Sequence, residues 1–123
     1  MGISYLEPNI LPAAPVLTIS ASAQEGYDDF IFTCEDDAEI YLAAAEGEEG
    51  VEPDLDSPGT YRMLDYYSNN TAILPQSGGR YKSMCVTWTV VAVRGNLMSP
   101  SIKVTIIYDA ESIRTVKLNG EII

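Results

Sequence analysis

Residues 84–93 read Met-Cys-Val-Thr-Trp-Thr-Val-Val-Ala-Val, and this stretch decides the fold class. It is rich in β-branched residues, which pack well on a pleated sheet. Its even and odd positions are both fairly apolar, which is typical of a central strand with the core on one face and partial cover on the other. By parity, Cys85 is expected on the face opposite Trp88.

Shorter strands are expected on both sides of this one. Residues 30–35, for example, alternate so that Phe30, Phe32 and Cys34 share one face. The complete set of expected strands is 15–21, 30–35, 39–43, 61–67, 71–74, 84–93 and 102–108. Turn signals separate them at 26–29, 36–37, 76–79 and 94–96. Short strands divided by regular turns predict an all-β antiparallel sandwich of about seven strands.

The segment after residue 43 favours a loop. Residues 43–46 read Ala-Ala-Ala-Glu and favour a helical turn, which Gly47 and Gly50 end at once. A long acidic loop is expected over 46–59.

Short motifs over residues 14–107 resemble the immunoglobulin-like module found at the C-terminal end of chitobiase and β-hexosaminidase-type glycosidases and in bacterial surface and phage proteins. The matching residues are Phe30-Ile31-Phe32-Thr33-Cys34, Ala38-Glu39-Ile40-Tyr41, Tyr61, Val90-Val91-Ala92-Val93-Arg94-Gly95-Asn96 and Ser99-Pro100. The chain departs from the family after Tyr41, where a Thr-rich turn with Asp-Gly-Ser is replaced by Leu42-Ala43-Ala44-Ala45-Glu46-Gly47. The resemblance implies an immunoglobulin-like sandwich that binds or spaces other molecules and is no enzyme.

The two ends of the chain are expected to lie outside this sandwich. Residues 1–13 hold Pro8 and Pro12 and no Lys or Arg, so they are expected as an extended arm, with a frayed terminus as an equal alternative. The sandwich is expected over 14–108 and a C-terminal hairpin or extension over 109–123. Asn119-Gly120 favours a two-residue type I′ turn. The hairpin either packs back on the sandwich or pairs with another chain.

These ends supply the candidate residues for binding another protein. The candidates are Tyr5, Leu6, Ile10, Leu11, Val116, Leu118, Ile122 and Ile123. The N-terminus lacks the basic and apolar regions of a secretion signal, so a cytoplasmic origin and reduced thiols at Cys34 and Cys85 are expected.

Charge is divided unevenly along the chain. Residues 1–61 hold 14 carboxylates and no basic residue, whereas residues 62–123 hold 4 carboxylates and 7 basic residues. The split predicts one strongly negative face or end and disfavours nucleic acid. The acidic loop 46–56 has three interpretations: a Ca²⁺ site, a solvated loop that keeps the protein soluble, or a surface complementary to a basic partner. The solvated loop is favoured, because EF-hand spacing is missing.

Composition excludes several kinds of active site. The chain has no histidine, which removes imidazole metal sites and Ser-His or Cys-His dyads. No glycine loop has phosphate-binding spacing and no cysteine cluster could hold zinc. No apolar run is long enough for a membrane helix. A glycosidase built on paired carboxylates is disfavoured, because a small sandwich offers no deep cleft. No cofactor, metal or catalytic residue is therefore predicted.

The eight tyrosines and one tryptophan leave a glycan site open. Its candidate residues are Tyr66, Tyr67, Asn69 and Asn70. The functional expectation is a structural or interaction module of a bacteriophage particle, in the capsid decoration or the tail, that is made in the host cytoplasm and binds other protein subunits. The alternative is a carbohydrate-binding or adhesion module at a bacterial cell surface. Neither nucleic acid nor membrane is an expected partner.

Overall fold

The fold consists of strands and turns. The structure is a computed structural model that describes residues 10–57, 62–63 and 70–123. Its strands are β1 (Val16–Ala21), β2 (Tyr27–Thr33), β3 (Glu39–Glu46), β4 (Arg62–Met63), β5 (Thr71–Pro75), β6 (Met84–Arg94), β7 (Leu97–Met98), β8 (Ile102–Tyr108), β9 (Arg114–Leu118) and β10 (Glu121–Ile122). The described part contains no helix, and so none that could cross a membrane. The all-β prediction is confirmed.

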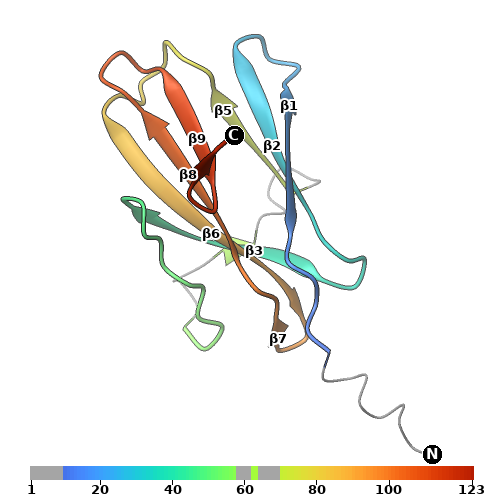
Figure 1. The fold of residues 1–123 in the computed structure, drawn as a ribbon. Coiled ribbons are helices and arrows are strands. Elements are labelled where there is room, and N and C mark those ends of the chain that lie inside the picture. The colour runs from blue at the N-terminus through green and yellow to red at the C-terminus, as the bar shows by residue number, and fades with distance from the viewer. Residues whose placement is uncertain (1–9, 58–61, 64–69) are drawn as a thin grey trace, which may run out of the picture.

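The strands form two antiparallel sheets that pack face to face (Figure 1). The smaller sheet has the order β1-β2-β5, and the larger has the order β10-β9-β8-β6-β3-β4, with β7 paired to the end of β6. The chain changes sheet between β2 and β3, between β4 and β5, and between β5 and β6, which ties the two layers together. The predicted antiparallel sandwich is confirmed.

The core lies between the sheets and is built from alternate residues of each strand. Phe30 and Phe32 of β2 point into it, and Trp88 of β6 meets both rings edge-on, at centroid distances of 6.2 Å and 6.3 Å. Tyr108 of β8 is buried, and its hydroxyl donates a hydrogen bond of 2.7 Å to the carbonyl of Pro75 in the other sheet. Burial raises the pKa of Tyr108 above its ordinary value, so the phenol stays protonated as a donor.

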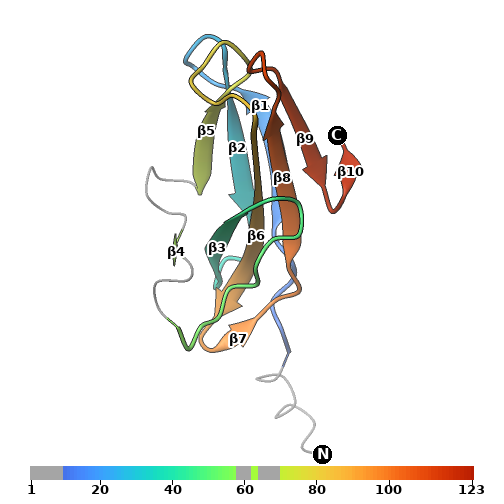
Figure 2. The ribbon, with the colours of Figure 1, turned by 90° about the vertical axis from the view of Figure 1, so that its left-hand side faces the viewer.

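The outer face of β6 is also covered, as the sequence predicts. Thr87 and Thr89 on that face are 0% exposed. The described part of the acidic loop, residues 47–57, runs across β6 and β8 on this side (Figure 2). The residues from 47 to 57 are called the acidic loop below.

The predicted turn at 26–29 and the predicted strand at 30–35 are displaced. β2 begins at Tyr27 and ends at Thr33, and the turn lies before it, where the amide of Ser22 donates to the carbonyl of Tyr27. Asp28 was expected in a turn because Asp favours turns. It stands in a strand because Arg114 and Gln76 bind its carboxylate.

The Ala-rich segment belongs to a strand. β3 runs to Glu46 and pairs with β6 over its whole length, so the predicted boundary at residue 43 and the helical turn at 43–46 are wrong. Eight residue pairs with a central strand outweigh the modest helix preference of three alanines. Of the predicted strand 61–67, only Arg62–Met63 lies among the described residues, as β4.

The two cysteines are free thiols in this structure. Cys34 follows the end of β2, packs against the core and donates a 3.3 Å hydrogen bond to the carbonyl of Ala38. Burial, helped by surrounding carboxylates such as Glu35, raises the pKa of the Cys34 thiol. Cys85 lies on β6, paired with Ile107.

Candidate functional site

One long side of the sandwich is open between the two sheets. It is bounded by β1, the edge strand of the smaller sheet, and by the hairpin β9–β10 at the edge of the larger sheet. Sheet edges carry unpaired backbone N–H and C=O groups, which makes them natural sites for pairing with another strand. This side is the candidate functional site.

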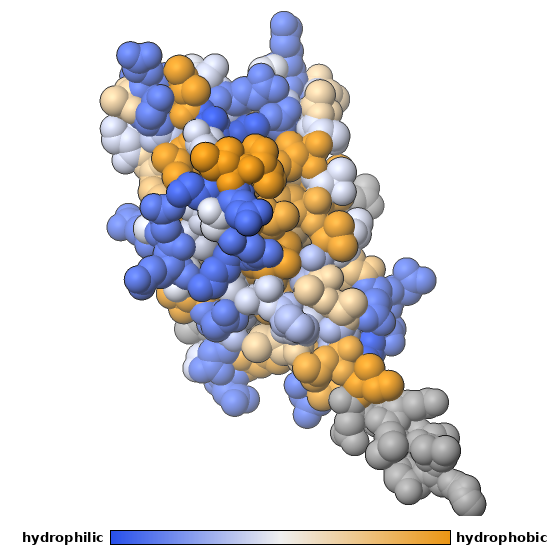
Figure 3. Space-filling view, in the orientation of Figure 1, coloured by the Kyte–Doolittle hydropathy of each residue, from blue (hydrophilic) through white to orange (hydrophobic). Residues whose placement is uncertain are grey.

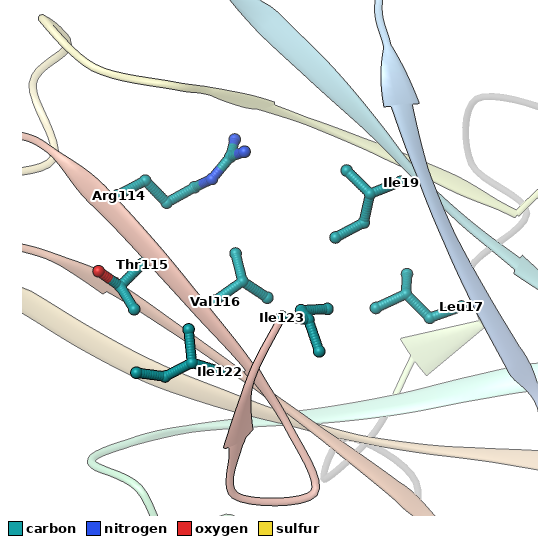
Figure 4. Close-up of a pocket in the computed structure, with 7 residues that line it drawn as sticks. All are labelled: Leu17, Ile19, Arg114, Thr115, Val116, Ile122 and Ile123. Carbon is teal, nitrogen blue, oxygen red and sulfur yellow. The ribbon is translucent and has the colours of Figure 1, made fainter.

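A groove of about 480 Å³ lies between these two edges. Its lining residues come from β1 on one wall and from β9 and the end of the chain on the other (Figure 4). They are Leu17, Ile19, Arg114, Thr115, Val116, Ile122 and Ile123. The wall is apolar apart from the guanidinium and one hydroxyl. The groove, called the β1–β9 groove below, therefore suits an apolar, extended ligand better than a charged one.

The hairpin turn shapes the C-terminal wall of the groove. Asn119 and Gly120 both have positive φ, 50° and 87°, as the predicted type I′ turn requires. The Asn119 side-chain oxygen accepts a 2.9 Å hydrogen bond from the amide of Lys103, which fixes the turn against β8. β10 is only two residues long and pairs with Lys117 and Leu118. The amide of Ile123 donates a 3.0 Å hydrogen bond to the carbonyl of Val116, so among the described residues only Arg114 and Thr115 of β9 lack a strand partner on this side.

Arg114 closes one end of the groove and joins the two sheets. Its guanidinium forms an ion pair with Asp28 of β2 and donates to the carbonyl of Pro75 of β5 at 3.2 Å. It also lies over the Phe30 ring, 5.1 Å from the centroid. The hydrogen bond from Arg114 holds the pKa of Asp28 below its usual range. Both charges are thus engaged inside the protein and are not offered to a ligand.

The β1 wall lacks the features by which proteins protect sheet edges. Its six residues, Val16–Ala21, contain no charged side chain and no proline. Residues 8–24 as a whole carry no charge. Natural edge strands are protected by Lys, proline or bulges, and an unprotected edge pairs readily with another strand. β1 pairs continuously and regularly with β2, and on its other side no strand among the described residues pairs with it.

The apolar surface continues around this side of the molecule. Ile122 and Ile123 are 71% and 60% exposed, and Val16 at the start of β1 is 60% exposed. Hydrophobic side chains gather between the C-terminal strands and β1 and reappear towards the N-terminal segment (Figure 3). Exposed isoleucines are costly in water, so a cluster of them indicates a surface that another molecule covers.

The structure brings together three of the eight residues predicted to bind a protein partner. Val116, Ile122 and Ile123 line the groove, whereas Leu118 packs against the core. Ile10 and Leu11 are exposed on the N-terminal segment, away from the groove. Tyr5 and Leu6 lie outside the described residues.

Sequence reasoning missed the opposite wall and its closing residue. Leu17, Ile19, Arg114 and Thr115 belong to the groove but were not among the predicted site residues. The alternation of residues 15–21 marks Leu17 and Ile19 as core-facing, and no local signal shows that their strand lies at an edge.

The acidic loop engages the basic residues of the larger sheet. Lys103 donates to the carbonyl of Glu49 at 2.6 Å, and Lys117 pairs with the carboxylate of Glu48 at 2.7 Å. Asp54 accepts hydrogen bonds from the amide of Asp56 and the hydroxyl of Ser57 within the loop itself. In the described part of the chain no three acidic or thiol side chains converge as a metal site would need.

The predicted glycan site falls largely on residues that the structure does not describe. Tyr66, Tyr67 and Asn69 lie outside the described residues. Asn70 is described, with a φ of 51°, and its carbonyl accepts a 3.0 Å hydrogen bond from the amide of Phe32. Its backbone thus supports the link between β5 and β2.

No family model, curated protein or solved structure matches this chain. The functional argument therefore comes from the groove.

Proposed function

We propose that this protein is a non-enzymatic, immunoglobulin-like module that binds an extended segment of another polypeptide in the β1–β9 groove. The observation that carries the proposal is Ile123, 60% exposed across the groove from Leu17 of an edge strand with no protective charge, with the 71% exposed Ile122 beside it (Figure 4). A strand added to β1 satisfies unpaired backbone groups and covers Ile123 at the same time.

The strand order supports the immunoglobulin-like assignment. In immunoglobulin domains, strands A, B and E share one sheet, and C, F and G share the other. Here β1, β2 and β5 occupy the first three places, and β3, β6 and β8 the second three. The chain does not form the antibody-type disulfide between B and F, because Cys34 and Cys85 are both free thiols. β9 and β10 add strands beyond G and so form the second wall of the groove.

The groove favours a polypeptide over a small ligand. It is open to solvent, and the one charged side chain among its lining residues, Arg114, is already paired with Asp28. Main-chain pairing supplies affinity in strand addition, and pockets for alternate side chains supply specificity. Leu17 and Ile19 on one wall and Val116 and Ile123 on the other present such pockets to alternate residues of an incoming strand.

A structural role in a bacteriophage particle remains our proposed setting, and it stays a prediction. Its support is the family resemblance of the strand motifs. Other protein subunits are the expected partners in that setting.

Selection of peptides from a random displayed library tests the binding function. The full chain is compared with a groove variant, Ile122→Lys/Ile123→Lys, in which two exposed side chains become charged. The control is Val51→Lys/Ile73→Lys, which places the same charges on two exposed residues elsewhere. We expect apolar peptides with period-two alternation that bind the wild type and the control and lose at least tenfold in affinity for the groove variant. Peptides that bind all three proteins equally, or no enrichment at all, contradict the proposal.

A further inference from the structure

We propose that the occupant of the β1–β9 groove is the N-terminal arm of a second copy of this chain, which adds a strand to β1 and links copies head to tail. This inference rests on the proposed function, which requires only that some polypeptide fills the groove. It names the partner as another molecule of the same protein.

The sequence of the arm matches the chemistry of the groove. Residues 1–6 read Met-Gly-Ile-Ser-Tyr-Leu and carry no charged side chain. In an extended strand alternate side chains share a face, so Met1, Ile3 and Tyr5 would share one side and Gly2, Ser4 and Leu6 the other. The first face is large and apolar throughout, as a strand that enters an apolar groove requires, and the second begins with two small residues before Leu6.

The arm is long enough to cover the edge of β1. A strand rises about 3.3 Å per residue, so the nine residues that precede Ile10 span up to about 30 Å. β1 has six residues, which span about 20 Å on the same scale. The arm can therefore pair along the whole edge and still leave a link to the rest of its own chain.

The first described residue, Ile10, is anchored away from the β1–β9 groove. The carbonyl of Ile10 accepts a hydrogen bond from Arg94, and the amide of Ala13 donates to the carboxylate of Glu35. Between these points the chain runs on from the start of β1, away from the sheets (Figure 1). Pairing with its own β1 would need a reversal within 10–15, where Pro12 is fully buried and Pro15 is buried. A neighbouring copy needs no such reversal.

Charge permits this contact between two acidic chains. Each copy carries a net charge of −11, so most approaches of two copies are repulsive. The contact proposed here joins residues 1–6, which hold no charged side chain, to the uncharged β1, and Glu7 is the only charged side chain in residues 1–24. The acidic loop lies on the outer face of the larger sheet, where it contacts Lys103 and Lys117. Contact between residues 1–6 and β1 therefore brings no like-charged side chains together.

The arm and the groove are different surfaces of one chain, so the contact is heterologous. A heterologous contact links copies into a ring when the rotation closes and into an open chain when it does not. A two-fold dimer through β1 alone would instead need no arm. This difference decides the experiment.

Two full-length variants, each lacking one side of the contact, test the inference by light scattering. The arm variant is Ile3→Ser/Tyr5→Ser, and the groove variant is Ile122→Lys/Ile123→Lys. Wild type is expected to grow in molar mass with concentration, beyond twice the 13.4 kDa monomer. Each variant alone is expected to stay at the monomer mass, because it lacks one partner of every contact. An equimolar mixture is expected to stop at a one-to-one dimer, since only one arm and one groove remain intact. The lysines make the chain less acidic, so added repulsion cannot cause the loss.

Three results would overturn the inference. A wild type that stays monomeric at all concentrations removes self-association. If the arm variant associates like the wild type, the arm is not needed and the copies meet through the edge of β1 itself. A mixture of the two variants that stays monomeric shows that arm and groove do not meet between copies. In each of these cases, peptides that bind the wild type and not the groove variant would still support the proposed function. Failure of this inference is therefore distinguishable from failure of the proposed function.

Discussion

Thr87 and Thr89 lie two residues apart on the outer face of β6, and their hydroxyl groups meet different surroundings. The Thr87 hydroxyl donates to the carbonyl of Gly47 at 2.6 Å, so the Thr105 hydroxyl, 2.8 Å away, acts as donor towards Thr87. The Thr89 hydroxyl is buried and, in the described structure, has no hydrogen-bond partner. A buried, unpaired hydroxyl carries a desolvation cost that no contact offsets.

Thr87→Val and Thr89→Val are therefore expected to change stability in different ways. Thr87→Val leaves the Gly47 carbonyl and the Thr105 hydroxyl without their partner, which costs about 1–3 kcal/mol. Thr89→Val replaces an unpaired hydroxyl by a methyl group of similar shape and is expected to be neutral or stabilising. Urea unfolding of the two variants measures the difference. Equal losses would show that Thr89 has a partner in solution.

Arg114 is the residue on which the open side of the sandwich depends most. Arg114→Met removes one partner of a nearly buried ion pair and is expected to cost about 3 kcal/mol in urea unfolding at neutral pH. Lys117→Met, on the same strand but in an exposed pair with Glu48, is the control and is expected to cost less than about 1 kcal/mol. Similar costs for both variants would mean that Arg114 does not hold the sheets together.

The pH dependence of this difference has a definite sign. The pKa of Asp28 is lowered in the folded protein, so the pair contributes fully above the unfolded carboxyl pKa of about 3.9. The contribution is lost as the pH falls through the lower, folded pKa. The stability difference between wild type and Arg114→Met is therefore expected to shrink as the pH falls from about 5 to about 2. A difference that stays constant over this range would contradict the assignment.

Among the elements, the acidic loop depends on one glycine. Gly50 has a φ of 77°, and a Cβ built there would lie 2.7 Å from the Thr89 hydroxyl oxygen. Gly47 also has a positive φ, 89°, but a Cβ there would have no neighbour within 4 Å. Both positions favour glycine for its backbone, and only Gly50 also needs it for the close approach of loop and sheet.

Gly50→Ala is expected to destabilise the protein more than Gly47→Ala. Each substitution is expected to lower the free energy of unfolding by about 1–2 kcal/mol, because alanine is strained in a left-handed backbone conformation. Gly50→Ala must also move the loop off β6, which loosens the contacts of Lys103 and Lys117. Urea unfolding gives both costs, and hydrogen exchange over β6 shows whether its outer face becomes accessible. Equal costs with unchanged exchange would rule out the close packing of this loop.

The elements that the sequence predicts correctly are those with a strong local signal. Residues 84–93 form most of β6, because β-branched side chains pack well on a pleated sheet. Asn119-Gly120 forms its turn, because both residues tolerate a positive φ. The errors arise where distant contacts outweigh local preference. Asp28 is held in β2 by Arg114, which lies 86 residues further along the chain.

For the whole molecule, the fold brings basic residues of the second half of the chain against some of the acidic residues of the first half. The sequence predicts a negative face or end, with an acidic first half and a slightly basic second half. In the fold, Lys103 and Lys117 of the second half lie against the acidic loop, and Arg94 pairs with Glu35 and Asp37. Much of the complementarity between the halves is thus used inside one chain.

Of the candidate site, only the C-terminal wall was predicted from the sequence. Ile122 and Ile123 were recognisable as apolar residues at the end of a marginal hairpin. The partner wall was not, because the edge position of β1 follows from the order of strands in the sheet, and that order depends on contacts across the whole chain. Alternation reports which residues face a core and not which strand lacks a neighbour.

Amide hydrogen exchange of the full chain at low and high protein concentration tests most directly whether β1 is a docking edge. A strand that pairs with β1 protects the amides that face away from β2, and β5, the opposite edge of the same sheet, serves as the internal control. The account predicts that exchange in Val16–Ala21 slows with concentration, while exchange in Thr71–Pro75 stays the same. Exchange in β1 that is independent of concentration, or equal slowing at both edges, would contradict it.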